Sequence, residues 1–139
     1  MKTNIATTSD QSQRLLRCGV SADTADMHRW VNSYGHEFLG TYRCPSPAVS
    51  LTPAWSLSAL LSDTLPCDIS DNEIDYSLFL QRRRSADNTP TWELSYYNLE
   101  YDATLLFVEA ADPIEAAVQM AERLTINGYK LNETNENEQ

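Results

Sequence analysis

The clearest pattern of hydrophobic and polar positions lies in the last third of the chain. Over residues 113–126, small and aliphatic side chains recur every three or four positions, which predicts an amphipathic helix. Asp112 suits the N-cap of this helix, Pro113 suits its first turn, and Glu115 stands at the spacing of a capping box. Gly128 suits its end, because glycine adopts the left-handed C′ conformation at little cost. The predicted apolar stripe consists of Ile114, Ala117, Val118, Ala121 and Leu124.

Three segments before this helix have the pattern of strands. In residues 74–81 and 91–97, apolar positions alternate with mostly polar ones, as in strands with one buried face. Residues 103–109 form a mostly apolar run. Their short connections favour an antiparallel meander. We therefore expect residues 74–109 to form three antiparallel strands, with residues 113–126 as a helix across one face. In the first strand the more polar register holds Asp75, Ser77, Phe79 and Gln81.

The N-terminal half is predicted to be helical or irregular. Residues 9–17 suit a short helix, and a second helix is expected to begin at Ser56, with Trp55 and Leu60 in contact as a hydrophobic staple. Residues 28–49 match neither the helical nor the strand period, and glycines and prolines interrupt them. The predicted fold class is α+β: a helical or irregular N-terminal half, then a three-stranded antiparallel meander, then a C-terminal helix packed on the sheet.

Length and composition favour one domain in a reducing compartment. Of the 139 residues, we expect 9–131 to form a single domain and the polar ends, 1–8 and 132–139, to lack structure. Three cysteines without a C-x-x-C pair argue against a disulfide framework and indicate the cytoplasm. Residues 44–62 are uncharged, but three of them are prolines and only ten are apolar, so no membrane-spanning helix is expected.

The charge is concentrated in one half of the chain. Residues 1–62 carry a net charge of +1 and residues 63–139 carry −11, which together give the total of −10. So many carboxylates disfavour nucleic acid as a partner, because phosphate contacts need Lys and Arg. Solubility explains this charge more simply than mimicry of nucleic acid toward a host protein. Arg82–Arg84 is the only basic run, and near Trp92 it suits either a single-stranded nucleic-acid surface or the protection of an edge strand.

Candidate chemical groups are present but lack a motif. His28, His36 and Cys44 are spaced eight and eight, which matches no metal-ligand spacing, and no sequence signature supports a Cys–His nucleophile pair. Four carboxylates lie on or beside the predicted strands, where two could face one another as an acid–base pair, although a solvated sheet face is the simpler interpretation. We therefore expect no catalytic residue, no metal and no cofactor. The four carboxylates are Glu93, Glu100, Asp102 and Glu109.

Three segments of the chain resemble a known pattern. T-A-D-M at 24–27, P-A-W-S-L-S-A-L-L at 53–61 and D-P-I-E-A-A-V at 112–118 are similar to a family of small uncharacterised proteins of gut bacteria, often encoded in prophage or other mobile regions. The resemblance covers most of residues 12–130 and implies a cytoplasmic, phage-related context, with no assigned activity. At 121–123 this chain is less apolar than that pattern. Ala103–Gly128 also resembles HicB-type antitoxins, in which a three-stranded meander precedes a similar helix.

The sequence therefore favours a non-enzymatic protein that binds another protein, as an accessory of a mobile element. The alternative is a small antitoxin-like regulator linked to nucleic acid, and an unrecognised enzyme comes third. We expect an unknown protein partner, no nucleic-acid partner and no membrane. A protein binder should expose an apolar patch, whereas a regulator should present Arg82–Arg84 on a positive face.

Overall fold

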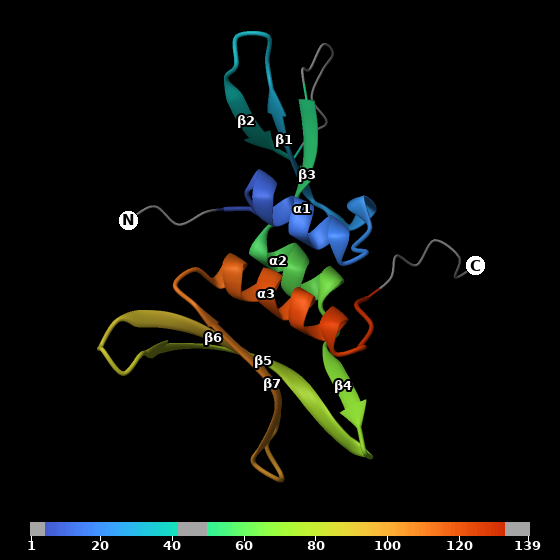
Figure 1. The fold of residues 1–139 in the computed structure, drawn as a ribbon, viewed down its shortest axis with the longest axis vertical. Coiled ribbons are helices and arrows are strands. Elements are labelled where there is room, and N and C mark those ends of the chain that lie inside the picture. The colour runs from blue at the N-terminus through green and yellow to red at the C-terminus, as the bar shows by residue number, and fades with distance from the viewer. Residues whose placement is uncertain (1–4, 42–49, 133–139) are drawn as a thin grey trace, which may run out of the picture.

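The computed structural model describes residues 5–41 and 50–132. It is a mixed α+β structure in which helices lie between two antiparallel sheets, of three and four strands (Figure 1). The helices are α1 (Ser9–Arg17), α2 (Leu57–Ala59), which continues into a π-helical turn η2 (Leu60–Thr64), and α3 (Pro113–Ile126), with a 3₁₀ turn η1 (Ala22–Thr24). The small sheet contains β1 (Met27–Val31), β2 (Glu37–Gly40) and β3 (Ser50–Ala54). The large sheet contains β4 (Asp68–Asp71), β5 (Ile74–Arg84), β6 (Pro90–Asn98) and β7 (Ala103–Ala110).

The large sheet has the strand order β4-β5-β6-β7, and all its neighbours are antiparallel. The predicted meander over residues 74–109 is therefore confirmed. The strand β4 was not predicted. It is joined to β5 by a two-residue turn, Asn72-Glu73, in which both residues have positive φ, of 52° and 68°. This is the backbone of a tight hairpin turn, but without a glycine it lacks the usual sequence signal.

Helix α3 is confirmed, and so is its predicted end. The amide of Tyr129 donates to the carbonyl of Leu124 at 2.9 Å and that of Gly128 to Thr125 at 3.2 Å, which are the two bonds of a Schellman motif. The predicted capping box is wrong. Asp112 makes no side-chain cap bond, and Glu115 instead accepts hydrogen bonds from α1. The helix therefore begins at a proline whose missing N–H needs no partner, and its first acidic residue serves tertiary packing.

The N-terminal half contains a sheet that was not predicted. Strands β1, β2 and β3 form a three-stranded sheet in the order β2-β1-β3, where the sequence suggested helical or irregular structure. Every residue of β1 is half-buried, so neither face of this strand shows the burial contrast that produces a period of two. Trp30 stacks on Phe38 with ring centroids 5.8 Å apart. Residues 42–49, part of the segment that matched no period, lie outside the described residues.

A short N-terminal segment is ordered, although the sequence predicted no structure there. Ala6 pairs with Ser56 as an isolated bridge, and Thr7 is buried, with its amide donating to the carbonyl of Trp55 at 2.9 Å. Thr8 then caps α1 in a capping box with Gln11. The expectation that residues 1–8 lack structure is thus wrong for Ala6 to Thr8, while residues 1–4 lie outside the described part.

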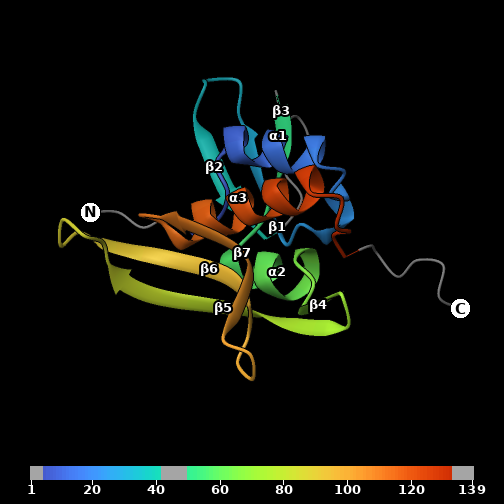
Figure 2. The same cartoon turned by 60° about the horizontal axis from the view of Figure 1, so that its bottom comes forward.

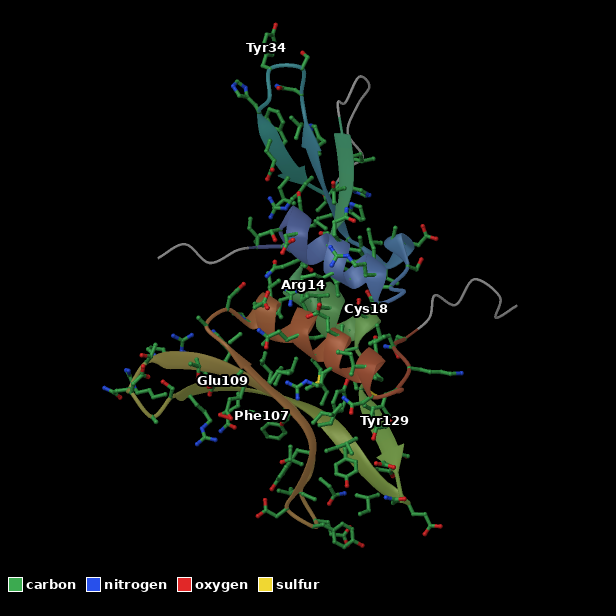
Figure 3. The ribbon with its side chains drawn as sticks, viewed as in Figure 1. Arg14, Cys18, Tyr34, Phe107, Glu109 and Tyr129 are labelled. Atoms are coloured by element: carbon green, nitrogen blue, oxygen red, sulfur yellow. The ribbon has the colours of Figure 1, made fainter. Side chains whose placement is uncertain are left out.

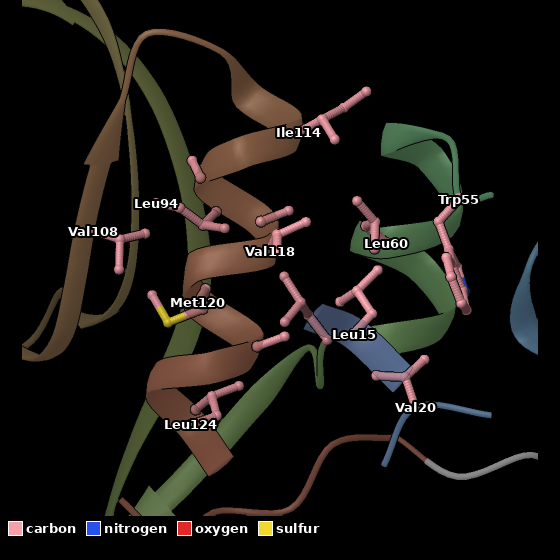
Figure 4. Packing of buried hydrophobic residues seen from close by; sticks show 14 of the residues in the cluster. Leu15, Val20, Trp55, Leu60, Leu94, Val108, Ile114, Val118, Met120 and Leu124 are labelled. Carbon is pink, nitrogen blue, oxygen red and sulfur yellow. The ribbon is translucent and has the colours of Figure 1, made fainter. Parts of the chain in front are cut away.

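The core lies on both sides of α3. One side of the helix packs on the large sheet, and the other faces α1, α2 and η2 (Figures 2 and 4). The predicted partners Trp55 and Leu60 are both fully buried in this cluster. Ser56 caps α2 as predicted, by accepting from the amide of Ala59 at 3.1 Å. Among the described residues, no helix combines the length and the hydropathy needed to cross a lipid bilayer.

Candidate binding surface on the four-stranded sheet

The two faces of the large sheet have different surroundings. Leu94, Tyr96 and Val108 point to α3 and are buried, so the alternate positions of the same strands point away from the helix. On that outer face the register places Phe79 of β5 and Phe107 of β7 on either side of Ser95 of β6. Their side chains are 50% and 45% exposed. Two aromatic rings therefore flank one small residue at the centre of the face that points away from α3.

A third aromatic side chain adjoins this pair. The ring of Tyr97 meets that of Phe79 edge to face, with centroids 6.0 Å apart, which is a favourable arrangement for two rings. Its hydroxyl donates to the carboxylate of Asp102 in the β6–β7 turn, and this hydrogen bond raises the pKa of Tyr97. We call Phe79, Tyr97 and Phe107 the aromatic patch. Phe107 and Glu109 are labelled on β7 in Figure 3.

Charged side chains form a band beside the aromatic patch. Glu93 of β6 and Glu109 of β7 are directly opposite one another, as the sequence allowed for two of the four carboxylates. Glu93 is only 8% exposed, and Nε of Arg83 lies 2.9 Å from its Oε2. Glu109 is exposed and accepts from the hydroxyl of Thr91 at 3.2 Å. Because Arg83 compensates the buried carboxylate, the pair is stabilised as part of the sheet surface.

The other two predicted carboxylates lie in a turn. Glu100 and Asp102 are exposed between β6 and β7, and neither faces Glu93 across a strand pair. Asp102 has a φ of 50°, a left-handed conformation that Asp tolerates better than most residues. The structure therefore brings together one carboxylate pair out of the four that the sequence suggested.

The three consecutive arginines have different partners. Arg82 lies over the ring of Trp92, 5.0 Å from its centroid, and Arg84 donates to the carbonyl of Asn88 at 3.1 Å. Arg83 alone is paired with a carboxylate in the described part of the chain. Together with Pro90 the three arginines line a shallow hollow of about 360 Å³. Among the described residues no carboxylate pairs with Arg82 or Arg84, so these two cationic groups can meet an external anion at this end of the sheet.

The predicted histidine and cysteine candidates are dispersed. His28 lies in β1 opposite Gly40, His36 lies at the β1–β2 turn, and Cys44 is outside the described residues. Within residues 5–41 and 50–132, no three His, Cys, Asp or Glu side chains are grouped to hold a metal ion. Burial raises the pKa of the Cys18 thiol, which is the opposite of what a nucleophilic cysteine needs. Cys67 is exposed beside Asp68.

A partly buried ion network joins α1 to α3. Arg14 of α1, which is labelled in Figure 3, donates to Glu115 at 2.8 Å and to Glu122 at 2.6 Å, and Gln11 also donates to Glu115. Burial raises the pKa of Glu115, but its hydrogen bonds from Arg14, Gln11 and Gln119 outweigh this and leave the pKa lowered. The bonds to both carboxylates raise the pKa of Arg14. Every charge in the network has a partner, which indicates a structural role.

The segments that carry the family resemblance also have structural roles. The indole N–H of Trp55 donates to the hydroxyl of Thr24 at 2.8 Å, and the amide of Ser56 donates to Asp26 at 2.9 Å. The T-A-D-M and P-A-W-S segments are therefore fastened to each other, and Glu115 of the third segment is held by Arg14. These residues build the junction between the two sheets, and none of them lies in the aromatic patch.

Comparison with known proteins gave no relative. No protein-family model, curated protein or solved structure matches the chain. The resemblances to gut-bacterial proteins and to HicB-type antitoxins therefore stay predictions.

Proposed function

We propose that the protein acts by binding another protein through the outer face of its four-stranded sheet. The observation that carries this proposal is the aromatic patch, in which Phe79 and Phe107 are about half exposed at the centre of a face that no helix of the described residues covers. Aromatic side chains supply much of the energy of protein interfaces, especially near the centre of a contact. Rigid strands hold these rings in place, so little conformational entropy is lost on binding.

The surroundings of the patch also suit a protein interface. Charged and polar groups border it, with Glu109 and Arg83 on one side and Asp102 on the other. A central apolar cluster with a polar rim is the usual anatomy of such contacts. A binding role is favoured over catalysis because the carboxylate pair of this face is compensated by Arg83 and the Cys18 thiol has a raised pKa. The proposed setting is that of a cytoplasmic accessory of a mobile element, which rests on the sequence resemblance alone.

The proposal is tested by comparing two double variants in a pull-down from the native host. Phe79→Ser with Phe107→Ser should abolish capture of a specific partner, whereas Leu99→Ser with Tyr101→Ser should leave it unchanged. The control pair is suitable because both side chains are apolar and exposed in the neighbouring β6–β7 turn, at 82% and 63%. Circular dichroism of both variants checks that the fold is kept. Equal capture by the two variants would contradict the proposal.

A nucleic-acid-linked regulator is the second candidate. Its support is the pair Arg82 and Arg84, which have no carboxylate partner among the described residues and lie beside Trp92. Three arginines at one hairpin are fewer than the six or more phosphate contacts of a typical DNA-binding protein, and charges elsewhere act mainly within about 8 Å at physiological salt. We therefore expect no binding to random single-stranded or duplex DNA in an anisotropy titration at that salt concentration. Micromolar binding, lost when all three arginines become alanine, would put the regulator first.

A further inference from the structure

Strand β5 extends well beyond the strand that pairs with its outer edge. Residues 68–71 of β4 cover only residues 74–77 of β5, and one further bond runs from the amide of Leu78 to the carbonyl of Cys67 at 3.0 Å. The preceding residue, Pro66, accepts from the hydroxyl of Tyr96 on the helix side of the sheet. The chain therefore leaves the sheet edge at Cys67, and no strand in the described part of the chain pairs with the outer edge of residues 80–84.

Within residues 5–41 and 50–132, no backbone group pairs with this edge, so its own backbone groups can pair with an added strand. In an antiparallel sheet, successive residues direct their N–H and C=O groups to opposite neighbours. Because the N–H of Leu78 points toward β4, those of Leu80, Arg82 and Arg84 point to the same, open side. The bond from the amide of Ser85 to the carbonyl of Thr89 fits this alternation, since odd-numbered residues pair with β6.

The side chains along this edge indicate which charge an added segment should carry. Arg82 and Arg84 share one face of the strand and have no carboxylate among the described residues, whereas Arg83 on the opposite face is paired with Glu93. A second copy of the chain is a poor occupant, because antiparallel pairing of two such edges would place arginines opposite arginines. Carboxylates are the complementary groups, and arginine binds them with two parallel hydrogen bonds.

We propose that residues 80–84 of β5 receive an extended acidic segment of a partner protein as a fifth strand of the sheet. This inference rests on the proposed function, since it names how the protein partner is held. Strand addition draws affinity from the main chain and specificity from alternate side chains. The added strand carries carboxylates on the face of Arg82 and Arg84, and apolar side chains on the other face, next to Phe79.

Selection from a random peptide library displayed on phage, with the full chain as bait, tests this inference. Enriched peptides should carry acidic residues at alternate positions and lack proline in the paired stretch. N-methylation of the backbone amides that face β5 should abolish binding of an enriched peptide, while N-methylation of the intervening amides should not. Enrichment of neutral or basic peptides, or of none, would overturn the inference.

Charge-reversal variants give the matched control. Arg82→Glu with Arg84→Glu should weaken an enriched peptide by about tenfold or more, because two attractive contacts become repulsive. Arg17→Glu with Arg123→Glu changes the net charge by the same amount as the first pair, at two exposed helical positions. This control should weaken binding of the same peptide by less than about twofold. Equal losses in both double variants would mean that only overall charge matters, and would overturn the inference.

A backbone variant separates strand addition from simple charge attraction. Arg82→Pro removes the N–H that faces the open edge, and proline is tolerated at such positions, whereas Arg82→Ala removes only the side chain. The proline variant should bind an enriched peptide several-fold more weakly than the alanine variant, with circular dichroism checking that both are folded. Equal binding by two folded variants would overturn the inference.

The remaining outcomes distinguish this inference from the proposed function. Peptides that depend on Phe79 and Phe107 but not on the arginines would overturn strand addition and leave the proposed function standing. Oligonucleotides bound through Arg82 and Arg84 would overturn both. Two further results would show that this chain fills the edge itself, and either would overturn the inference. One is a dimer of the wild-type chain that dissociates when Arg82→Glu and Arg84→Glu are introduced. The other is a large gain in peptide affinity when residues 133–139 are removed.

Discussion

The four-stranded sheet has α3 packed across one face, where Leu94 and Tyr96 are buried, while Phe79 on the opposite face is exposed. In the three-stranded sheet, all of β1 is half-buried, and β2 has no buried residue. Arg29 of β1 ties the small sheet to the N-terminal segment through bonds to the carbonyls of Thr7 and Ala6, at 2.7 and 3.3 Å. The large sheet is thus stabilised by a hydrophobic layer. The small sheet is stabilised largely by the backbone hydrogen bonds between its strands and by a few polar contacts.

This difference predicts how stability is distributed. Burial of apolar area is the main favourable term in folding, so the large sheet with α3 should form the most stable unit. Segments with few buried apolar contacts open at lower free energy than the core. The small sheet should therefore open without unfolding the rest, and the following substitutions test this.

Replacement of the two tryptophans should give the largest contrast. Trp55 is fully buried at the junction, so Trp55→Ala should lower the free energy of unfolding by about 3–5 kcal/mol through the lost packing and the cavity. Trp30 in the small sheet is half-buried, and Trp30→Ala should cost about 1–2 kcal/mol. Chemical denaturation measures both. A loss below about 1 kcal/mol for Trp55→Ala would show that its indole is not packed, and equal losses would break the comparison between the sheets.

A leucine from each sheet gives a second, smaller contrast. Leu94 in β6 is fully buried, and Leu94→Ala should cost about 2–5 kcal/mol. Leu51 in β3 is 50% exposed, and Leu51→Ala should stay within about 0.5 kcal/mol of the wild type. Thermal and urea unfolding should rank the two variants alike. If Leu51→Ala were as damaging as Leu94→Ala, the small sheet would have to be part of the cooperative core.

The same difference explains which elements the sequence predicts. In β5 the positions that face α3 are less exposed than those between them, and this burial of one face appears in the sequence as a period of two. The apolar stripe of α3 is clear because the helix packs on the sheet with one side and on α1, α2 and η2 with the other. In β1 neither face is fully buried, so the fold does not require apolar residues at every second position. The sequence of this strand therefore shows no clear period of two. The short β4 depends on the Asn72-Glu73 turn, whose left-handed residues are not glycine.

The candidate surface was only partly visible in the sequence. Phe79 falls in the polar register of its strand, and this aromatic residue among polar ones is the signal that could have located the patch. Phe107 stands in a continuous apolar run, where periodicity cannot assign a face. The pairing of Arg14 with Glu115 joins residues 101 positions apart, and no local pattern encodes it. The capping box was wrong for this reason, because a distant arginine competes for the same carboxylate.

The network between α1 and α3 should contribute less than the core does, and its contribution should depend on pH. Arg14→Ala should cost about 1.5–3 kcal/mol, since it removes charge-assisted hydrogen bonds to Glu115 and Glu122. The pKa of Glu115 is lowered on folding, so its stabilisation is complete above its unfolded-state pKa and is lost as the pH falls through its folded-state value. The acid limb of the stability profile should therefore be shallower in Glu115→Gln than in the wild type.

The control for this network is Arg17, which is exposed in the last turn of the same helix. Arg17→Ala should change stability by less than about 0.5 kcal/mol and should keep the wild-type acid limb. Urea titrations at a series of acidic pH values measure all three variants. An unchanged acid limb in Glu115→Gln would mean that the ion pair is already weakened by solvent in the native protein.

The smallest contrast between the two regions should come from two glycines with similar backbone conformations. Gly128 ends α3 with a φ of 84°, and Gly35 lies in the β1–β2 turn with a φ of 82°. A Cβ at either position meets no atom within 4 Å, so alanine adds only the strain of a left-handed residue, about 1 kcal/mol.

At Gly128 this strain should appear in full as lost global stability, because α3 unfolds only with the core. At Gly35 the loss cannot exceed the free energy of opening the small sheet, since opening relieves the strain. Gly35→Ala should therefore speed amide hydrogen exchange in β1 and β2 while moving the global unfolding midpoint less than Gly128→Ala does. Equal midpoint shifts, with no local change in exchange, would show that both sheets unfold as one unit.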